Sequence, residues 1–140
     1  MADTTHTFPT TGADDATVGT YAWTNPGNIT ADDGSYAECT YIRPEGVTAY
    51  YSHYLKATDF AWAGGDVPVD ATVRGFEVKI EHNNAGIGQQ VYDETVKLVV
   101  NGSVAGDNKA TATQWGASGW EVFTYGGASD LWGLTQDVDF

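Results

Sequence analysis

The stretch from residue 76 to residue 81 constrains the fold of this chain more than any other. In Phe76–Glu81 every second side chain is apolar, and the residues between are charged. A strand with one buried face and one solvent-facing side shows this period of two, because successive side chains point to opposite sides. Val96–Val100 repeats the alternation, and Asn101-Gly102 supplies the positive φ angles of a hairpin turn before Ser103–Ala105. We therefore predict that residues 71–106 form the centre of an antiparallel sheet.

Turn-forming clusters of Gly, Pro, Asn and Asp recur at short intervals elsewhere, and no long amphipathic helical stretch appears. Further strands are predicted between these clusters, at residues 18–23, 36–42, 47–55 and 120–125. The third is expected to continue through Phe60 and Trp62 with a kink or bulge near residues 56–59. Such spacing is typical of sandwiches and jelly rolls. We predict an all-β chain: an antiparallel, jelly-roll-like β-sandwich over residues 18–140, preceded by an extended N-terminal arm over residues 1–17.

Composition limits the classes of partner. A chain of 140 residues is long enough for one conventional core, and its 13% aromatic residues and 17 Gly favour strands and turns. The formal net charge of −13 argues against binding to nucleic acid or to an anionic membrane, because both require Lys and Arg. Such charge keeps a protein soluble, or attracts a basic or cation-coated partner. The N-terminus has neither the basic nor the apolar region of a signal peptide, which predicts synthesis in a cytoplasm.

No arrangement of residues indicates catalysis or a bound metal. Cys39 is the only cysteine, and the alternation around it predicts a buried, inert thiol. None of the three histidines stands in a zinc-binding spacing, and no serine lies in a nucleophile-elbow pattern. Oxygen-rich turns at residues 32–35 and 107–108 could supply calcium ligands, although ordinary turn chemistry is the favoured interpretation. We expect no enzymatic activity, no cofactor and no metal.

The aromatic residues supply the candidate contacts. Trp and Tyr bury large areas and anchor protein interfaces, so a core or interface role is favoured. A flat platform for sugar rings, as in carbohydrate-binding modules, is the alternative. The candidate interface or glycan contacts are Phe8, Trp62, Trp115, Trp120 and Trp132.

Several segments, in order between residues 18 and 134, carry a likeness to a known group of proteins. These segments are Tyr21–Pro26 with Asp32–Ala37, Ser52–Phe60, Val73–Val78, Val96–Val99, Gly106–Lys109 and Tyr125–Leu134. Together they resemble tailed-bacteriophage structural proteins with jelly-roll-like domains, found in phage and prophage head or tail gene clusters. The resemblance implies a virion component that is not an enzyme. Members of the group continue past the segment ending at Leu134 with further strands, so the resemblance implies either a diverged C-terminus or a missing closing strand. For the second case our hypothesis is that a strand or arm of a neighbouring subunit, such as residues 1–17, covers the open sheet edge.

We therefore expect a virion structural protein made in the host cytoplasm. Within that class we favour a capsid decoration (cement) protein that binds the assembled head through protein–protein contacts and stabilises it by mass action. A tail or fibre component, or a carbohydrate-binding module, is the alternative. The expected partners are capsid or tail subunits and further copies of the chain, with a trimer as one closed arrangement.

Overall fold

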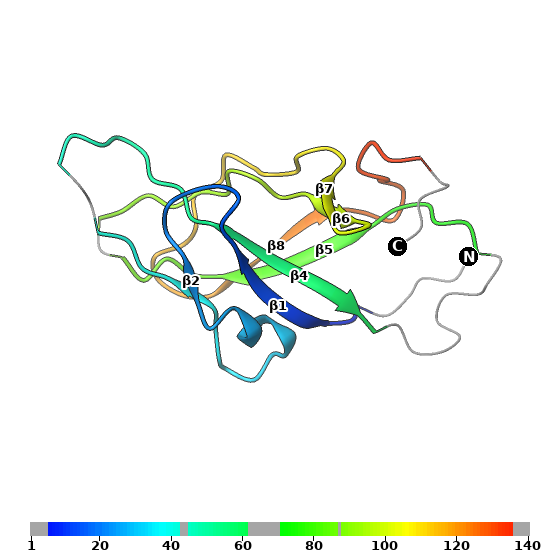
Figure 1. The fold of residues 1–140 in the computed structure, drawn as a ribbon, viewed down its shortest axis with the longest axis horizontal. Coiled ribbons are helices and arrows are strands. Elements are labelled where there is room, and N and C mark those ends of the chain that lie inside the picture. Colours follow the sequence, from blue (N-terminus) through cyan, green and yellow to red (C-terminus); the bar gives the residue numbers. More distant parts are fainter. Residues whose placement is uncertain (1–5, 43–44, 62–70, 87, 136–140) are drawn as a thin grey trace. The chain divides into compact units, whose positions relative to one another are not determined.

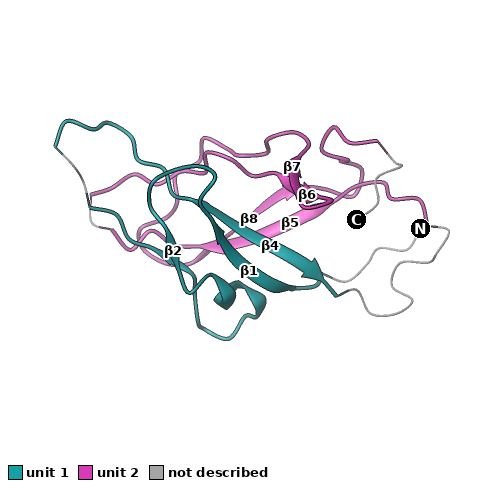
Figure 2. Cartoon of the chain, in the orientation of Figure 1, with its two compact units in different colours: residues 1–69 teal, residues 70–140 magenta. Residues whose placement is uncertain are grey.

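The computed structural model describes four stretches of the chain, residues 6–42, 45–61, 71–86 and 88–135. They fall into two compact units, unit 1 over Met1–Val69 and unit 2 over Asp70–Phe140 (Figure 2). Within the described stretches the one helix is a short 3-10 helix, η1 (Pro26–Thr30), and the regular structure is otherwise β (Figure 1). None of these stretches holds a helix with the length and hydropathy that a membrane crossing needs. The prediction of an all-β chain is confirmed.

Unit 1 contains two antiparallel strand pairs. β1 (Pro9–Asp15) pairs with β4 (Tyr54–Phe60), and β2 (Trp23–Thr24) pairs with β3 (Glu38–Cys39). The strands predicted over residues 18–23 and 36–42 are therefore much shorter than expected. Alternation around β3 is nevertheless present, since Cys39 is half-buried between exposed neighbours.

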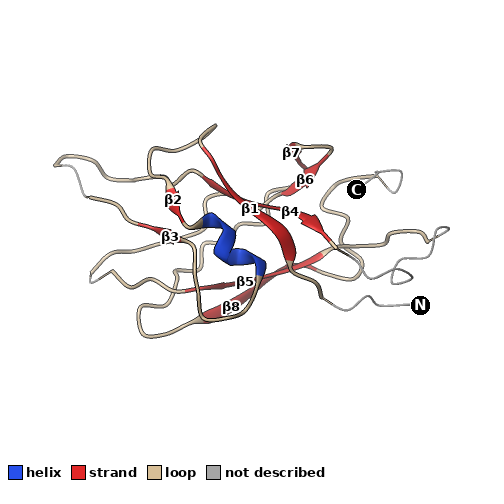
Figure 3. Cartoon of the chain, turned by 60° about the horizontal axis from the view of Figure 1, so that its bottom comes forward, coloured by secondary structure: helices blue, strands red, loops and turns tan. Residues whose placement is uncertain are grey.

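Residues 9–15 correct the prediction of an N-terminal arm. They form β1, which pairs along one edge with β4 of the same chain. The small residues of this segment also allow a close approach that large side chains would prevent. A Cβ atom at Gly12 would lie 2.1 Å from the carbonyl oxygen of Pro26, so glycine is what lets η1 run alongside β1 (Figure 3).

The third predicted strand begins later than expected and includes Phe60, while Trp62 lies outside the described residues. β4 starts at Tyr54 and reaches Phe60, and its regular geometry is interrupted at Asp59, which has φ 57°. Thr10 Oγ1 compensates by donating a hydrogen bond of 2.7 Å to the Asp59 carbonyl oxygen. The kink predicted near residues 56–59 is confirmed.

Unit 2 also contains two antiparallel pairs. β5 (Glu77–His82) pairs with β8 (Glu121–Gly126), and β6 (Leu98–Val100) forms a hairpin with β7 (Ser103–Ala105). The turn residues Asn101 and Gly102 have φ 49° and 77°, as the sequence predicts for this two-residue turn. The partner of β5 is β8, however, so residues 71–106 do not form a sheet centre by themselves.

The β5–β8 pair has one exposed and one covered face. Glu77, Lys79 and Glu81 are exposed, whereas Val78 and Ile80 are half-buried and His82 is 3% exposed. The register places Tyr125, Phe123 and Glu121 directly opposite these three covered positions. Residues directly opposite in an antiparallel pair share a face, so the six side chains form one surface, the inner face of β5–β8.

A long hairpin over residues 91–115 continues from β6 and β7. Beyond the two strands, Lys109 N donates to Val96 O and Trp115 N donates to Val91 O, each at 2.9 Å. The hairpin contacts the inner face of β5–β8 at its open end, where the Trp115 indole stacks on the His82 ring. Unit 2 therefore has two layers at this point.

Trp132 is the most deeply buried side chain among the described residues, with no exposed surface. Its indole Nε1 donates to the Phe76 carbonyl oxygen at 2.9 Å, and its backbone oxygen accepts a bond from Asp107 N. A Cβ atom at Gly126 would lie 2.3 Å from Nε1, so the missing side chain there makes room for the indole. The ring thereby holds the C-terminal turn against β5 and β8.

Every sheet in the described stretches has two strands. This arrangement shows a β-rich fold built from small sheets. The jelly-roll-like sandwich stays a prediction.

Candidate functional site

Three tyrosine rings from separate segments of unit 1 meet in one cluster. The rings of Tyr41 and Tyr50 are nearly parallel, with an interplanar angle of 17° and centroids 6.1 Å apart. The ring of Tyr21 stands edge-on to both, with centroids at 6.4 Å from Tyr41 and 6.2 Å from Tyr50. Edge-to-face and offset stacks are the arrangements that the ring quadrupole favours. The cluster is therefore a packed aromatic unit.

Hydrogen bonds fix where these rings lie. Tyr21 N donates to Tyr51 O at 3.3 Å, and the segments meet in a parallel bridge between Tyr21 and Ser52. The Tyr21 hydroxyl donates to the Ile42 carbonyl oxygen at 2.9 Å, and the Tyr50 hydroxyl donates to the Val47 carbonyl oxygen at 3.1 Å. Each hydroxyl thus anchors the backbone of an aliphatic residue at the edge of the cluster.

Three residues whose backbone oxygens accept hydrogen bonds from Tyr21 or Tyr50 have side chains that are open to solvent. Ile42 is 81% exposed, Tyr51 50% and Val47 41%. We call these three residues, together with the three clustered tyrosines, the tyrosine patch. Aromatic residues that keep a polar edge are enriched in protein interfaces, and rigid rings lose little conformational entropy on binding. The tyrosine patch has the chemistry of a protein-binding surface.

The five predicted contact residues differ in how far they are buried. Trp132 is wholly buried and is excluded from any surface contact, because its indole fills the core of unit 2. Trp115 is half-buried and committed to His82 and Asp93. Trp120 is 44% exposed and Phe8, just before β1, is 54% exposed, while Trp62 lies outside the described residues. The candidate contacts predicted from the sequence included no residue of the tyrosine patch, so this surface was missed.

The tyrosine-rich run of residues 50–54 was the available signal for this patch. Its partners Tyr21 and Tyr41 lie in other segments, so only the fold shows that the rings converge.

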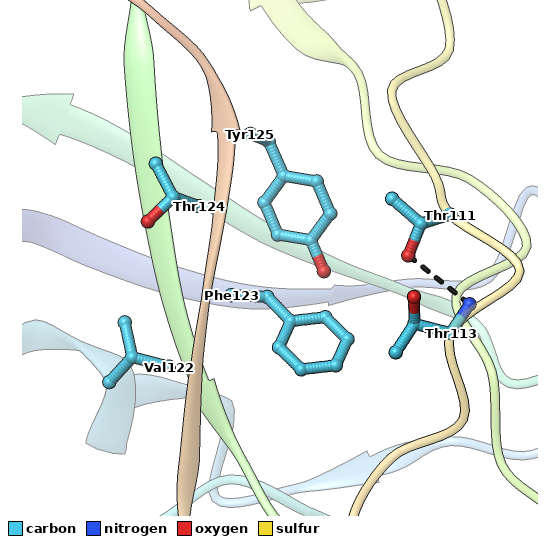
Figure 4. Close-up of a pocket in the computed structure, with 6 residues that line it drawn as sticks. All are labelled: Thr111, Thr113, Val122, Phe123, Thr124 and Tyr125. Atoms are coloured by element: carbon cyan, nitrogen blue, oxygen red, sulfur yellow. Dashed lines mark hydrogen bonds between the residues drawn. The ribbon is translucent and has the colours of Figure 1, made fainter.

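An open hollow of about 280 Å³ lies in unit 2 beside β8. Figure 4 shows the Phe123 and Tyr125 rings pointing toward Thr111 and Thr113, with Val122 and Thr124 on the other side of the strand. Thr113 N donates a long bond of 3.4 Å to Thr111 Oγ1. The lining offers ring surfaces and threonine hydroxyls, but no charged group.

Asp93 organises the polar contacts behind this hollow. Its Oδ1 accepts from Trp115 Nε1 at 3.1 Å, and its Oδ2 accepts from the Tyr125 hydroxyl at 2.5 Å. Burial, with a smaller contribution from the bond to Asp93, raises the pKa of Tyr125 far above its ordinary value. The phenol therefore stays protonated and ties β8 to the long hairpin.

An aspartate–histidine pair lies in unit 1. His53 Nδ1 donates to Asp14 Oδ2 at 2.8 Å, and Asp14 Oδ1 accepts from Trp23 N at the same distance. The hydrogen bond from His53, followed by that from Trp23, lowers the pKa of Asp14 below its ordinary value. The nearby Cys39 thiol makes its contact with the Tyr21 carbonyl oxygen at 3.8 Å, and burial raises the pKa of Cys39. A thiol of this kind is a poor nucleophile.

The acidic turns that could have bound calcium make local hydrogen bonds. Asp33 Oδ1 accepts from Ser35 N at 2.9 Å, an ordinary Asx turn. Asn108 Oδ1 accepts from Val96 N and Ala110 N, and its Nδ2 donates to Glu94 O, so Asn108 braces the long hairpin. In the described part of the chain no three His, Cys, Asp or Glu side chains gather as a metal site would require.

Comparison of the chain with protein-family models, with curated proteins and with solved structures finds no match.

Proposed function

We propose that this protein is a structural component of a phage virion and that it binds neighbouring subunits of the particle through the tyrosine patch. Within that class we favour a capsid decoration protein, with a tail or fibre component as the alternative. The proposal includes a jelly-roll-like sandwich as the complete fold, and it assigns the protein no enzymatic activity and no cofactor.

The observation that carries the proposal is the exposure of Ile42, Val47 and Tyr51 around a rigid tyrosine cluster. Burying a side chain such as Ile42 in an interface is worth roughly 1.5–3 kcal/mol. The three clustered rings are already ordered by stacking and by hydrogen bonds to the backbone. Pre-ordered rings reduce the entropy lost on binding, which is the usual requirement for an interface hot spot.

Two features of the sequence support the virion class. The segments between residues 18 and 134 resemble phage structural proteins over most of the chain, and the net charge of −13 is compatible with an exposed, soluble position. Self-association into a closed ring, with a trimer as one such arrangement, belongs to the same proposal, because repeated surfaces on a particle favour symmetric partners.

Co-sedimentation with particles of the encoding phage that lack this chain tests the proposal. Isolated heads and isolated tails are incubated separately with wild type, with an Ile42→Ser/Tyr51→Ser double variant, and with Val104→Ser. Val104 is the control, because it is 45% exposed on β7 of unit 2, outside the tyrosine patch. We expect the double variant to bind at least about tenfold more weakly, since each 1.4 kcal/mol lost is a factor of ten, and the control to bind as wild type does.

Binding to heads alone supports the decoration role, and binding to tails alone supports the tail alternative. Equal binding by wild type and the double variant contradicts the role of the tyrosine patch. Failure to bind either particle contradicts the virion proposal. A glycan array then tests carbohydrate recognition, for which the exposed Trp120 is the residue to replace.

A further inference from the structure

His82 is a buried titratable group of unit 2, whereas the tyrosine patch belongs to unit 1. It ends β5 on the inner face of β5–β8 and is 3% exposed. Neither ring nitrogen meets a hydrogen-bonding partner from another described residue. A buried polar group without partners costs free energy, and a buried charge without partners costs more.

Two aromatic rings enclose the imidazole. The Trp115 indole lies parallel to it, with centroids 4.2 Å apart and an interplanar angle of 2°. The Phe123 ring meets it edge-on, also with centroids at 4.2 Å. Since Trp115 ends the long hairpin and Phe123 lies on β8, the His82 ring joins the two layers of unit 2.

The charged and titratable groups that face His82 already have other partners. Asp93, on the long hairpin, accepts from the Trp115 indole and from the Tyr125 hydroxyl. On β8, Glu121 Oε2 accepts from Gly116 N at 3.0 Å, and the Tyr125 hydroxyl donates to Asp93. Burial lowers the pKa of His82 below 6.5, and it outweighs Asp93, a hydrogen bond to the backbone of His82 itself and Glu121, all of which favour the protonated ring.

We propose that His82 makes the docking of the long hairpin onto β5–β8 sensitive to acid. The neutral ring holds Trp115 and Phe123 together, and the protonated ring must leave this enclosure to reach water. Lowering the pH therefore releases the open end of the hairpin while the rest of unit 2, held by Trp132, stays closed. This inference does not depend on the virion proposal.

The direction and size of the effect follow from linkage. His82 binds a proton more readily when the hairpin is released, so docking is fully stable above pH 6.5 and weakens as the pH falls toward the lower pKa of the docked state. For one group, the docking equilibrium constant falls about tenfold for each pH unit in that window. Carboxylates titrate mostly below about pH 4.5, so the window down to about pH 5 is dominated by histidine.

The Asn84 backbone N–H provides a local readout, because it follows β5 and donates at 3.0 Å to the carbonyl oxygen of Gly116, just past the end of the long hairpin, only while the hairpin is docked. We would measure its hydrogen-exchange protection factor by NMR on the full chain from about pH 7.5 to about pH 5, a range that brackets the ordinary pKa of histidine. The indole N–H groups of Trp132, bonded to Phe76 O, and of Trp23, bonded to His53 O, serve as internal controls. The same series is repeated with His82→Phe, which keeps an aromatic ring but cannot be protonated, and with His6→Gln as the control variant.

We expect the protection of the Asn84 amide to fall by up to about tenfold per pH unit below 6.5 in wild type and in His6→Gln, and to stay constant in His82→Phe. The protection of Trp132 and Trp23 should stay constant throughout. A constant Asn84 protection in wild type, or an equal fall in His82→Phe, overturns the proposal. If His82→Phe does not fold, the His82 ring signals of the wild-type chain decide instead: titration below pH 6.5 supports the proposal, and titration at or above 6.5 overturns it.

Discussion

Replacing Trp132 by phenylalanine would keep an aromatic ring in the core of unit 2 but remove the indole N–H. That group donates a 2.9 Å bond to the Phe76 carbonyl oxygen, and the ring itself is completely buried. The carbonyl would keep its bond from Gly127 N, so the backbone there would remain partly satisfied. The substitution therefore isolates one hydrogen bond and the volume of the missing ring atoms.

The expected cost is the sum of two terms of similar size. Losing one neutral hydrogen bond costs about 1 kcal/mol, and the cavity left by a smaller ring adds about another 1 kcal/mol. We thus expect Trp132→Phe to lower the free energy of unfolding by about 2 kcal/mol, and Trp132→Ala to lower it by about 3–5 kcal/mol. Trp132 has a positive φ of 56°, and the backbone strain at this angle is the same in both variants, because both keep a Cβ atom.

Urea unfolding followed by circular dichroism measures these differences. Trp120→Phe is the matched control, since Trp120 is 44% exposed and surface changes usually stay within about 0.5 kcal/mol. If Trp132→Phe proved as stable as Trp120→Phe, the indole would not be the anchor of unit 2, and the account of its core would be wrong.

Two further predictions concern unit 1. Gly12→Ala should lower the free energy of unfolding by roughly 1–3 kcal/mol, because its Cβ would meet Pro26 O at 2.1 Å. Gly27→Ala meets nothing within 4 Å and should be nearly neutral in the same urea unfolding experiments. Asp14 has a pKa lowered below 3.8 by its bond to His53, so its ionised form stabilises the fold above that pH, and this contribution is lost as the pH falls through the lowered value. Asp14→Asn should therefore be less stable than wild type at neutral pH, with the difference vanishing in strong acid; a difference independent of pH would count against this.

Local patterns predicted several elements of the fold correctly. Alternation over residues 76–81 and 120–125 anticipated β5 and β8, and the Asn101-Gly102 pair anticipated the β6–β7 turn. These features depend on neighbouring residues, so one sequence contains them. The pairing of β5 with β8 joins segments far apart in the chain, and alternation says nothing about which strand a given strand will meet.

The predictions that were wrong also have physical explanations. Residues 9–15 lack large apolar side chains and were expected to form an arm, but backbone pairing with β4 and close approach to η1 suit small residues. Trp132 was named as a candidate interface or glycan contact, because composition alone does not distinguish a buried indole from an exposed one. His82 could have been placed, since it continues the covered positions Val78 and Ile80 with the same period of two.

A cryo-electron microscopy map of the phage particle that we propose carries this chain tests the central claim most directly. We predict that the tyrosine patch, with Ile42 and Tyr51 at its exposed edge, faces a neighbouring subunit and is covered by it. A map in which the chain is attached to the particle while the patch remains open to solvent would contradict the account.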